Sequence, residues 1–457
     1  MAVYDDQTIC ALATAVGGPV AVVRLSGTKA LAAAQALWSP VGRHRLDEDG
    51  QARRLLLGRL TDGGEVVDSQ CLAVYMPGPD SYTGEDVVEF HLHGGSVAVR
   101  MALDALEKQG VRSALHGEFT RRAFLNGKMD LTQAEAVAEM VAATSRAALS
   151  LANRQLAGGF GGKLNPIDIL LKTLLAELES HLDFPEEELD WMPLSEMCRQ
   201  FQESRKALTE LAATRREGEV LRGGVRLAIA GAPNAGKSSL LNRLLGRERA
   251  IVSPIPGTTR DTVEADCVIR QIPFRIVDTA GIRESADRIE QDGVRRSQAA
   301  VGEADVVLWV MDSALPPGEA MPFPAEWSCR GRIIVVANKC DVPGSRPQEG
   351  AVAFSARTGE GFDGLCDALE AAVFGQGGCV SGELAVSGRH AALLETAAAK
   401  LAECCDALAG EGRLDEPPWE VAAIPLRGAL AALGEVTGQA VSPDVLDTIF
   451  HRFCIGK

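Results

Sequence analysis

The sequence Gly231-Ala232-Pro233-Asn234-Ala235-Gly236-Lys237-Ser238 has the spacing G-x-x-x-x-G-K-S. The apolar run at 225–230 predicts a strand before it, and the apolar spacing at 239–245 predicts a helix after it. In such a unit the backbone N–H groups bind phosphates at the helix N-terminus, Lys237 reaches the β- and γ-phosphates, and Ser238 binds Mg²⁺. A match of this length also fits an accidental turn, so the downstream sequence decides.

A second apolar strand, expected at 274–277, leads into Asp278-Thr279-Ala280-Gly281. There Asp278 can hold Mg²⁺ through water, and the Gly281 amide can contact a γ-phosphate. The intervening segment Gly257-Thr258-Thr259-Arg260-Asp261 can place a threonine hydroxyl, that of Thr259, on the metal. These segments predict the triphosphate side of a nucleotide site.

A third strand, expected at 332–337, runs into Asn338-Lys339-Cys340-Asp341. The Asp341 carboxylate would accept from two donors on the guanine edge, an arrangement that adenine lacks, and such a site rejects the wrong base strongly. Ser355-Ala356-Arg357 follows at the spacing of a loop near guanine O6. Four elements in this order downstream of the glycine-rich loop predict a GTPase. The predicted nucleotide-binding residues are Asn234, Ala235, Gly236, Lys237, Ser238, Ser239, Thr258, Thr259, Asp278, Thr279, Ala280, Gly281, Asn338, Lys339, Asp341, Ser355, Ala356 and Arg357.

Composition sets wider bounds. A chain of 457 residues is too long for one core, so two to four domains are expected. The net charge of −16 disfavours wholesale binding of a nucleic-acid backbone, although a local basic patch would suffice. Eleven cysteines without a C-x-x-C pair indicate reduced, cytosolic thiols. We find neither an apolar stretch long enough to span a membrane nor a secretion signal, so we expect a cytoplasmic protein.

The chain divides by its periodicity. Strand-like runs at 20–25, 71–76 and 86–91 and a helical stretch at 96–110 predict an α+β module at 1–125. Long Ala/Leu/Glu-rich segments predict helices at 131–158, 163–182, 196–219, 388–409 and 425–436. We therefore expect a Ras-like, parallel-sheet α/β GTPase domain at 218–377, inserted into a helical domain whose halves are 126–217 and 378–457.

Beyond the GTPase motifs, further segments resemble one family. They are Arg24-Leu25-Ser26-Gly27, 81–86 (SYTGED), His93-Gly94-Gly95, 117–128 (GEFTRRAFLNGK), Asp183-Phe184-Pro185-Glu186 and Phe453-Cys454-Ile455-Gly456-Lys457. Together with the GTPase motifs they resemble the MnmE (TrmE) family of tRNA-modification GTPases across essentially the whole chain. The resemblance implies a folate-binding N-terminal domain, a split helical domain and an inserted GTPase domain.

The resemblance also implies a reaction. Members act on the wobble uridine of certain tRNAs with an FAD-containing partner, MnmG (GidA), and install an aminomethyl or carboxymethylaminomethyl group at C5. A tetrahydrofolate derivative, of 5-formyl or methylene type, supplies or carries the one-carbon unit, and GTP hydrolysis drives the conformational cycle. The family forms homodimers through the N-terminal domain, which would bring two GTPase domains together.

The resemblance assigns the folate site to Arg24, Glu89, Lys128 and Lys457. A folate has an anionic glutamate tail that suits Arg or Lys and a pterin edge that a carboxylate can bind with paired hydrogen bonds. Without the family, a surface arginine, a strand-edge glutamate and solvated lysines would be the simpler interpretation.

Hydrolysis needs a substitute for the water-orienting glutamine of many small GTPases, because Ile282 occupies that position. The resemblance implies a potassium ion, which would neutralise charge that develops between the phosphates. It also implies a catalytic Glu290, which would orient water; an ordinary exposed acid is the alternative. The implied metal ligands are Ser238 and Thr259 for Mg²⁺, and Asn234, Ser253, Ile255 and Thr258 for K⁺.

Cys454 lies near the C-terminus, where chains are commonly frayed. The apolar Ile449, Phe450 and Phe453 could instead dock this tail, and Gly456 permits a tight turn. Cys454 would then act in the one-carbon transfer, either as a catalytic thiol or by positioning.

Two other functions share some of these features. A ribosome-assembly or signalling GTPase would use the same nucleotide motifs, and a folate-dependent enzyme could carry a regulatory GTPase domain. The folate-type N-terminal module and the Cys454 tail favour tRNA modification over the first alternative, and we find no basic RNA-binding domain beside the GTPase motifs.

Overall fold

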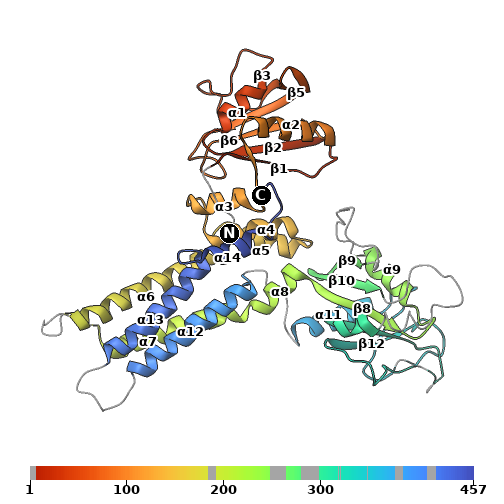
Figure 1. The fold of residues 1–457 in the computed structure, drawn as a ribbon. Helices are drawn as coiled ribbons and strands as arrows, with labels where there is room; N and C mark the ends of the chain where they lie inside the picture. Colours follow the sequence, from red (N-terminus) through yellow and green to blue (C-terminus); the bar gives the residue numbers. More distant parts are fainter. Residues whose placement is uncertain are drawn as a thin grey trace. The chain divides into compact units, whose positions relative to one another are not determined.

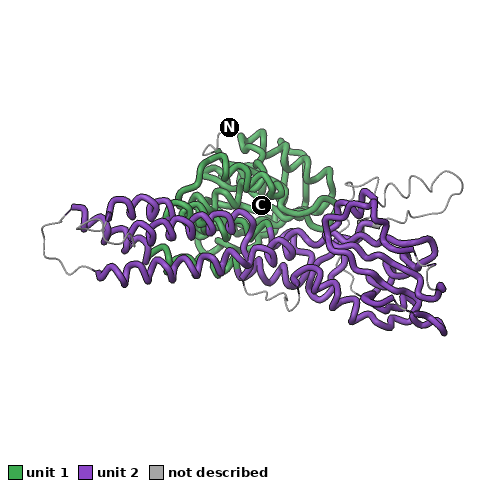
Figure 2. The backbone as a smooth tube through the Cα atoms, turned by 90° about the horizontal axis from the view of Figure 1, so that it is seen from below, with its two compact units in different colours: residues 1–138, 155–169, 430–457 green, residues 139–154, 170–429 purple. Residues whose placement is uncertain are grey.

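The computed structural model describes residues 7–183, 192–247, 264–278, 298–316, 319, 321–346, 348–375, 384–408 and 418–457. The chain forms two compact units (Figure 2). The first comprises residues 1–138, 155–169 and 430–457, and the second comprises 139–154 and 170–429. Within the described ranges, no helix is both long and apolar enough to cross a membrane.

The first unit contains a seven-stranded sheet in the order β3-β4-β5-β6-β2-β1-β7. All neighbouring strands are antiparallel except β1 and β7. The strands are β1 (Ile9–Leu12), β2 (Val20–Ser26), β3 (Trp38–Pro40), β4 (Leu56–Asp62), β5 (Glu65–Met76), β6 (Val87–His93) and β7 (Arg112–Ser113). The sheet confirms the α+β expectation for this part of the chain, although β5 begins six residues before the predicted run at 71–76.

Helices α1 (Ala30–Leu37) and α2 (Ser96–Lys108) share a buried core with this sheet (Figure 1). Val23 and Leu25 of β2 belong to that core. Side chains alternate across a strand, so Arg24 points to the opposite face of the sheet. Its register partner on β6 is Glu89, and the two residues therefore share that face.

The remaining helices of the first unit bring distant parts of the chain together. They include α3 (Glu118–Leu125), α4 (Leu131–Ala142) and α14 (Pro443–Phe450). Leu131 and Ala134 of α4 form one buried cluster with Ile449, Phe450 and Phe453. The C-terminal segment is thus packed against the first helices after the sheet, as the apolar residues of the tail predicted.

The second unit contains a six-stranded sheet in the order β13-β12-β11-β8-β10-β9. Only the β9–β10 pair is antiparallel. The strands are β8 (Val225–Gly231), β9 (Glu264–Ile269), β10 (Ile272–Asp278), β11 (Val306–Asp312), β12 (Arg332–Asn338) and β13 (Val352–Ala353). The predicted strands at 225–230, 274–277 and 332–337 are β8, β10 and β12, which confirms the expected parallel-sheet α/β fold.

Helices α9 (Lys237–Arg247) and α11 (Phe362–Phe374) share one buried cluster with this sheet, and Trp309 lies in a second cluster. Because both faces are covered, β8 and β11 are almost entirely apolar. The carboxyl ends of the parallel strands meet at one edge, where α9 begins.

The other helices are α5 (Arg146–Leu156), α6 (Gly159–Asp183), α7 (Leu194–Ala213), α8 (Arg215–Gly223), α12 (Gly388–Leu408) and α13 (Trp419–Thr437). Helices α7 and α12 run side by side (Figure 1). They lie on either side of the six-stranded sheet in the sequence, which agrees with a GTPase fold inserted into a helical one.

Three predicted helices differ most in their limits. The helix expected at 131–158 is broken into α4 and α5, because Ser145 Oγ accepts from the Ala148 amide at 3.1 Å and caps a new helix. The one expected at 196–219 is interrupted at Thr214, whose hydroxyl bonds the Leu211 carbonyl at 2.7 Å. Helix α13 begins six residues before the predicted start at Pro425, which it accommodates internally.

Candidate functional site

The loop between β8 and α9 is shaped by left-handed backbone conformations. Asn234 has φ +59° and Gly236 has φ +95°. A Cβ atom on Gly236 would lie 2.1 Å from Asn338 Nδ2, so only glycine permits this close approach. Lys237 Nζ donates to the carbonyl oxygens of Gly231 at 3.1 Å and Ala232 at 2.8 Å. The lysine is thereby held over its own loop, where a phosphate oxygen could replace those carbonyl acceptors.

Asn338 connects this loop to the segment 355–357. Its side chain is buried, and Nδ2 donates to the Ala235 carbonyl at 2.8 Å. Its Oδ1 accepts from the Ala356 amide at 3.0 Å. One side chain at the end of β12 therefore fixes both loops relative to each other.

Asp341 is oriented by two neighbours. Ser355 Oγ donates to Oδ1 at 2.6 Å, and an Arg357 guanidinium nitrogen lies 2.6 Å from Oδ2. The hydrogen bond from Ser355, assisted by the charge of Arg357, lowers the pKa of the Asp341 carboxyl. The carboxylate is therefore ionised at neutral pH and acts only as an acceptor, as a partner of two N–H donors requires.

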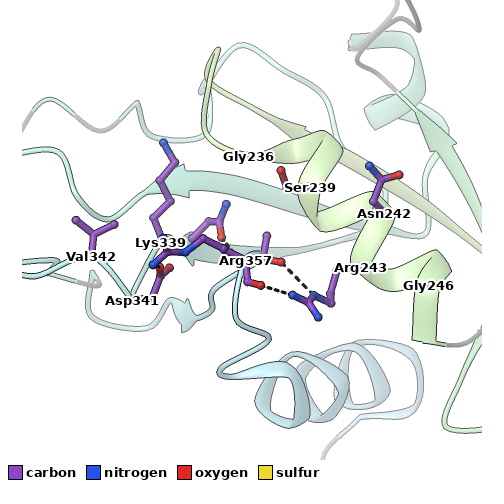
Figure 3. A pocket seen from close by; sticks show the side chains of 11 residues that line it. Gly236, Ser239, Asn242, Arg243, Gly246, Lys339, Asp341, Val342 and Arg357 are labelled. Carbon is purple, nitrogen blue, oxygen red and sulfur yellow. Dashed lines mark hydrogen bonds and ion pairs between the residues drawn. The ribbon is translucent and has the colours of Figure 1, made fainter.

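Of the residues just described, Gly236, Asn338, Asp341 and Arg357 line a pocket of about 750 Å³ (Figure 3). Figure 3 shows side chains from α9 on one side and from the end of β12 and the 355–357 loop on the other. Its lining residues are Gly236, Ser239, Asn242, Arg243, Gly246, Asn338, Lys339, Asp341, Val342, Ala356 and Arg357. The volume is that of a small-molecule site.

A second group of predicted residues lies on the sheet of the first unit. Arg24 Nε donates to Glu89 Oε1 at 2.7 Å, and both side chains are mostly buried. The Arg24 guanidinium lies 5.5 Å from the Tyr82 ring centroid and 5.8 Å from that of Phe119. Burial opposes ionisation of Glu89, but bonds with His91 and Arg24 outweigh it and lower the pKa of this carboxyl.

The C-terminal tail lies against the same unit. Ile455 pairs with His116 in an antiparallel bridge, and His116 Nδ1 donates to the Phe453 carbonyl at 2.8 Å. Gly456 is next to Leu12, the last residue of β1. Strand β1 pairs with β2, and Ala11 lies opposite Arg24 in that pairing. The segment carrying Cys454 and Lys457 is thus docked at the end of β1, in the sheet that holds the Arg24–Glu89 pair.

Comparison with known proteins assigns the parts of the chain that carry these two groups of residues to one family. The MnmE helical domain family matches residues 131–454, and the family described as the GTP-binding protein TrmE N-terminus matches residues 8–128. A tRNA modification GTPase MnmE from a Synechococcus strain is 42% identical over 464 residues, which cover 99% of each chain. The chain belongs to the MnmE family of tRNA modification GTPases. MnmE proteins from Parasynechococcus marenigrum and Geobacter sulfurreducens are 44% and 41% identical, and 99% of this chain is covered in both alignments.

Several residues that were predicted from the GTPase motifs or from the MnmE resemblance lie outside the described residues. They are Ser253, Ile255, Thr258, Thr259, Thr279, Ala280, Gly281 and Glu290. The backbone of Asp278 is described and pairs with Ile229 of β8. Lys128 lies apart from the Arg24–Glu89 pair in sequence and donates to the Pro79 carbonyl at 2.9 Å.

Two polar residues that contact the predicted nucleotide-binding segments were not predicted from the sequence. Asp312 ends β11 and its Oδ2 lies 2.5 Å from Lys339 Nζ. The apolar run 306–311 followed by an aspartate was a usable signal, because parallel strands end at a common edge. Arg243 of α9 donates to the carbonyl oxygens of Ala356 and Arg357. Nothing in its local sequence indicates this contact.

A buried ionic cluster explains the sequence 117–128 in physical terms. Glu118 is fully buried and is bonded by Arg112 at 2.7 Å, Arg122 at 3.0 Å and the Leu115 amide at 2.8 Å. Burial alone would raise the pKa of Glu118, but these donors, Arg112 foremost, lower it. The cluster fixes α3, whose N-terminal neighbour His116 contacts the tail.

Proposed function

We propose that this MnmE-family GTPase installs an aminomethyl or carboxymethylaminomethyl group at C5 of the wobble uridine of tRNA. It would act with an FAD-dependent partner of the MnmG (GidA) type and with a tetrahydrofolate derivative of 5-formyl or methylene type that carries the one-carbon unit. The observation that carries the proposal is that the Cys454 segment docks on His116 and on the end of β1, the strand that pairs with the Arg24 strand, within one compact unit.

The donor set around Arg24 fits a folate. Among the described residues, Arg24 engages Glu89 Oε1 at 2.7 Å and His91 Nε2 lies 3.4 Å from Oε2, so acceptor capacity remains for a pterin edge. Tyr82 and Phe119 supply aromatic surface next to the arginine. Lys128 and Lys457 would meet the anionic tail. A bound folate supplies the one-carbon unit, and this chain would hold and orient it.

The pocket between α9 and the 355–357 loop fits a guanine nucleotide. Asp341 would accept from the guanine N1 and N2 donors, while Asn338, Lys339 and the loop residues Ser355, Ala356 and Arg357 would enclose the base. Lys237 and the amides at 234–239 would bind the phosphates. The proposed nucleotide-binding residues are the same as those predicted from the sequence.

Two metal ions would complete the site of GTP hydrolysis. Ser238, at the start of α9, would hold Mg²⁺ with Thr259, and Asn234 would hold K⁺ with Ser253, Ile255 and Thr258. The left-handed, exposed Asn234 fits this role, because its side chain is not committed to the protein core. The two ions supply positive charge at the phosphates, and Glu290 would orient water.

We further propose a cytoplasmic homodimer. Leu55, Leu57 and Val66 are about half exposed, and Leu57 and Val66 lie on β4 and β5 of the first unit, which offers apolar surface for a second copy. Two GTPase domains could then meet and order the loops around the potassium ion. The proposed division remains 1–125, 126–217, 218–377 and 378–457.

Tests of binding separate this function from its alternatives. Isothermal titration of the full chain with GDP and with a reduced folate should show two independent sites, and Glu89→Gln should weaken only the folate. A chain that binds guanine nucleotide but no folate would contradict the proposal and favour a ribosome-assembly or signalling GTPase. The family match over the N-terminal and helical parts already favours tRNA modification.

A further inference from the structure

Arg243 links the phosphate-binding helix to the loop at the base end of the pocket. It lies on α9, six residues after Lys237. Its Nε donates to the Ala356 carbonyl at 3.0 Å, and a terminal guanidinium nitrogen donates to the Arg357 carbonyl (Figure 3). The guanidinium therefore spans two consecutive carbonyl groups, a geometry that suits its fixed fork of donors.

The same loop is held from its other side by Asn338. The Ala356 amide donates to Asn338 Oδ1 at 3.0 Å, and Asn338 Nδ2 reaches the Ala235 carbonyl at 2.8 Å. Asn338 thus engages the N–H side of the loop, whereas Arg243 engages its C=O side. Asn338 therefore connects the loop to the glycine-rich segment, and Arg243 connects it to α9.

The end of the loop that Arg243 holds has little apolar support. Phe354, Ser355 and Ala356 are buried, and Ala356 belongs to the core cluster of the sheet, so the core fixes the loop as far as Ala356. Arg357, in contrast, has a side chain that is 81% exposed. Polar contacts must therefore keep Arg357 in place, and Arg243 supplies one of them to the Arg357 carbonyl from the rim of the pocket.

We propose that Arg243 is a positioning residue for the guanine nucleotide. It fixes the loop 355–357 to α9, which slows nucleotide release and strengthens binding, and it takes no part in the hydrolytic step. The proposal rests on the proposed assignment of this loop to guanine. Asp341→Asn tests that assignment separately, through the preference for GTP over xanthosine triphosphate.

The experiment uses the full chain and fluorescent GDP. Arg243→Met keeps the unbranched apolar stem and the helix propensity of the side chain but removes its donors, and Arg243→Lys keeps a charged donor without the fork. Arg332→Met is the matched control, because Arg332 donates to the Ala371 carbonyl at 3.0 Å from the start of β12, the end opposite Asn338.

We expect Arg243→Met to raise the release rate of GDP and the KM for GTP by about tenfold, with kcat changed by less than about twofold. Arg243→Lys should give an intermediate release rate, and Arg332→Met should match the unaltered chain. A merely structural role would lower thermal stability without separating KM from kcat.

The proposal is overturned if Arg243→Met releases GDP at the rate of the Arg332→Met control, or if kcat falls as much as kcat/KM. If Arg243→Met does not fold, Arg243→Lys decides: faster release supports the proposal and an unaltered rate overturns it. If Asp341→Asn leaves the preference for GTP unchanged, the assignment of this loop to guanine is overturned separately.

Discussion

Replacement of Gly456 by alanine tests whether tail docking matters for tRNA modification. Gly456 has φ +95°, and an added Cβ would lie 2.3 Å from the Leu12 carbonyl oxygen and 3.0 Å from Ala13 Cα. A left-handed alanine costs about 1 kcal/mol, and rotation of a side chain cannot relieve a clash with backbone. Displacement would also break the bond from His116 to the Phe453 carbonyl, worth about 1 kcal/mol.

The sum of about 2 kcal/mol lowers the ratio of docked to undocked tail about thirtyfold. Hydrogen exchange at 453–457 should accelerate by a similar factor, the modification of tRNA should fall, and GTP turnover should be unchanged. Gly110→Ala is the matched control, because Gly110 has φ +77° and open space around its Cβ position. If Gly456→Ala exchanges its tail amides at the rate of the unaltered chain and modifies tRNA fully, Gly456 is not needed for tail docking.

Four further predictions concern the other sites. Asp341→Asn should weaken GTP and favour xanthosine triphosphate, because the donor–acceptor pattern inverts; an unchanged preference in a competition assay would contradict the assignment. Asn234→Ala should abolish the expected advantage of potassium over sodium in GTP turnover, and equal rates in both salts with the unaltered chain would reject the ion site. Glu290→Ala should spare nucleotide binding and slow single-turnover hydrolysis by about a hundredfold, whereas unchanged hydrolysis would exclude it. Glu118→Gln should lower the free energy of unfolding by about 3 kcal/mol. The pKa of Glu118 is lowered on folding, so its stabilisation is complete above the unfolded value of about 4.3 and is lost as pH falls through the folded pKa. Urea titrations should therefore show the two proteins converging only in acid, and a constant difference down to low pH would argue against the ionic role.

Much of the GTPase fold could be predicted because its signals are local. The strand before Gly231 and the helix after Lys237 each lie within a few residues of the glycine-rich loop, so their order and type follow from short-range patterns. The residues proposed to bind guanine follow a third strand, β12, in the same way. Such contiguous motifs can be recognised without knowledge of tertiary contacts.

The missed features depend on contacts between distant segments. Arg243 bonds residues more than one hundred positions away, and its position on a helix surface resembles that of any solvated arginine. Lys339 and Asp312 meet because two parallel strands end together. Helix limits failed at Ser145 for another reason, since a single side-chain cap outweighed a favourable helix composition.

The N-terminal site lies between these cases. The register of β2 and β6 places Arg24 opposite Glu89, and no local pattern specifies that pairing. The family resemblance supplied both residues, and the structure shows that they are in contact.

Reconstitution of the reaction tests whether this chain modifies the wobble uridine. The purified chain, an FAD-dependent partner of the MnmG type, unmodified tRNA, GTP and a reduced folate would be combined, and the nucleosides analysed by mass spectrometry. We predict an aminomethyl-type substituent on the wobble uridine, absent without folate and absent with Cys454→Ser, while that variant still hydrolyses GTP. Unmodified uridine in the complete mixture despite GTP hydrolysis, or full modification by Cys454→Ser, would contradict the account.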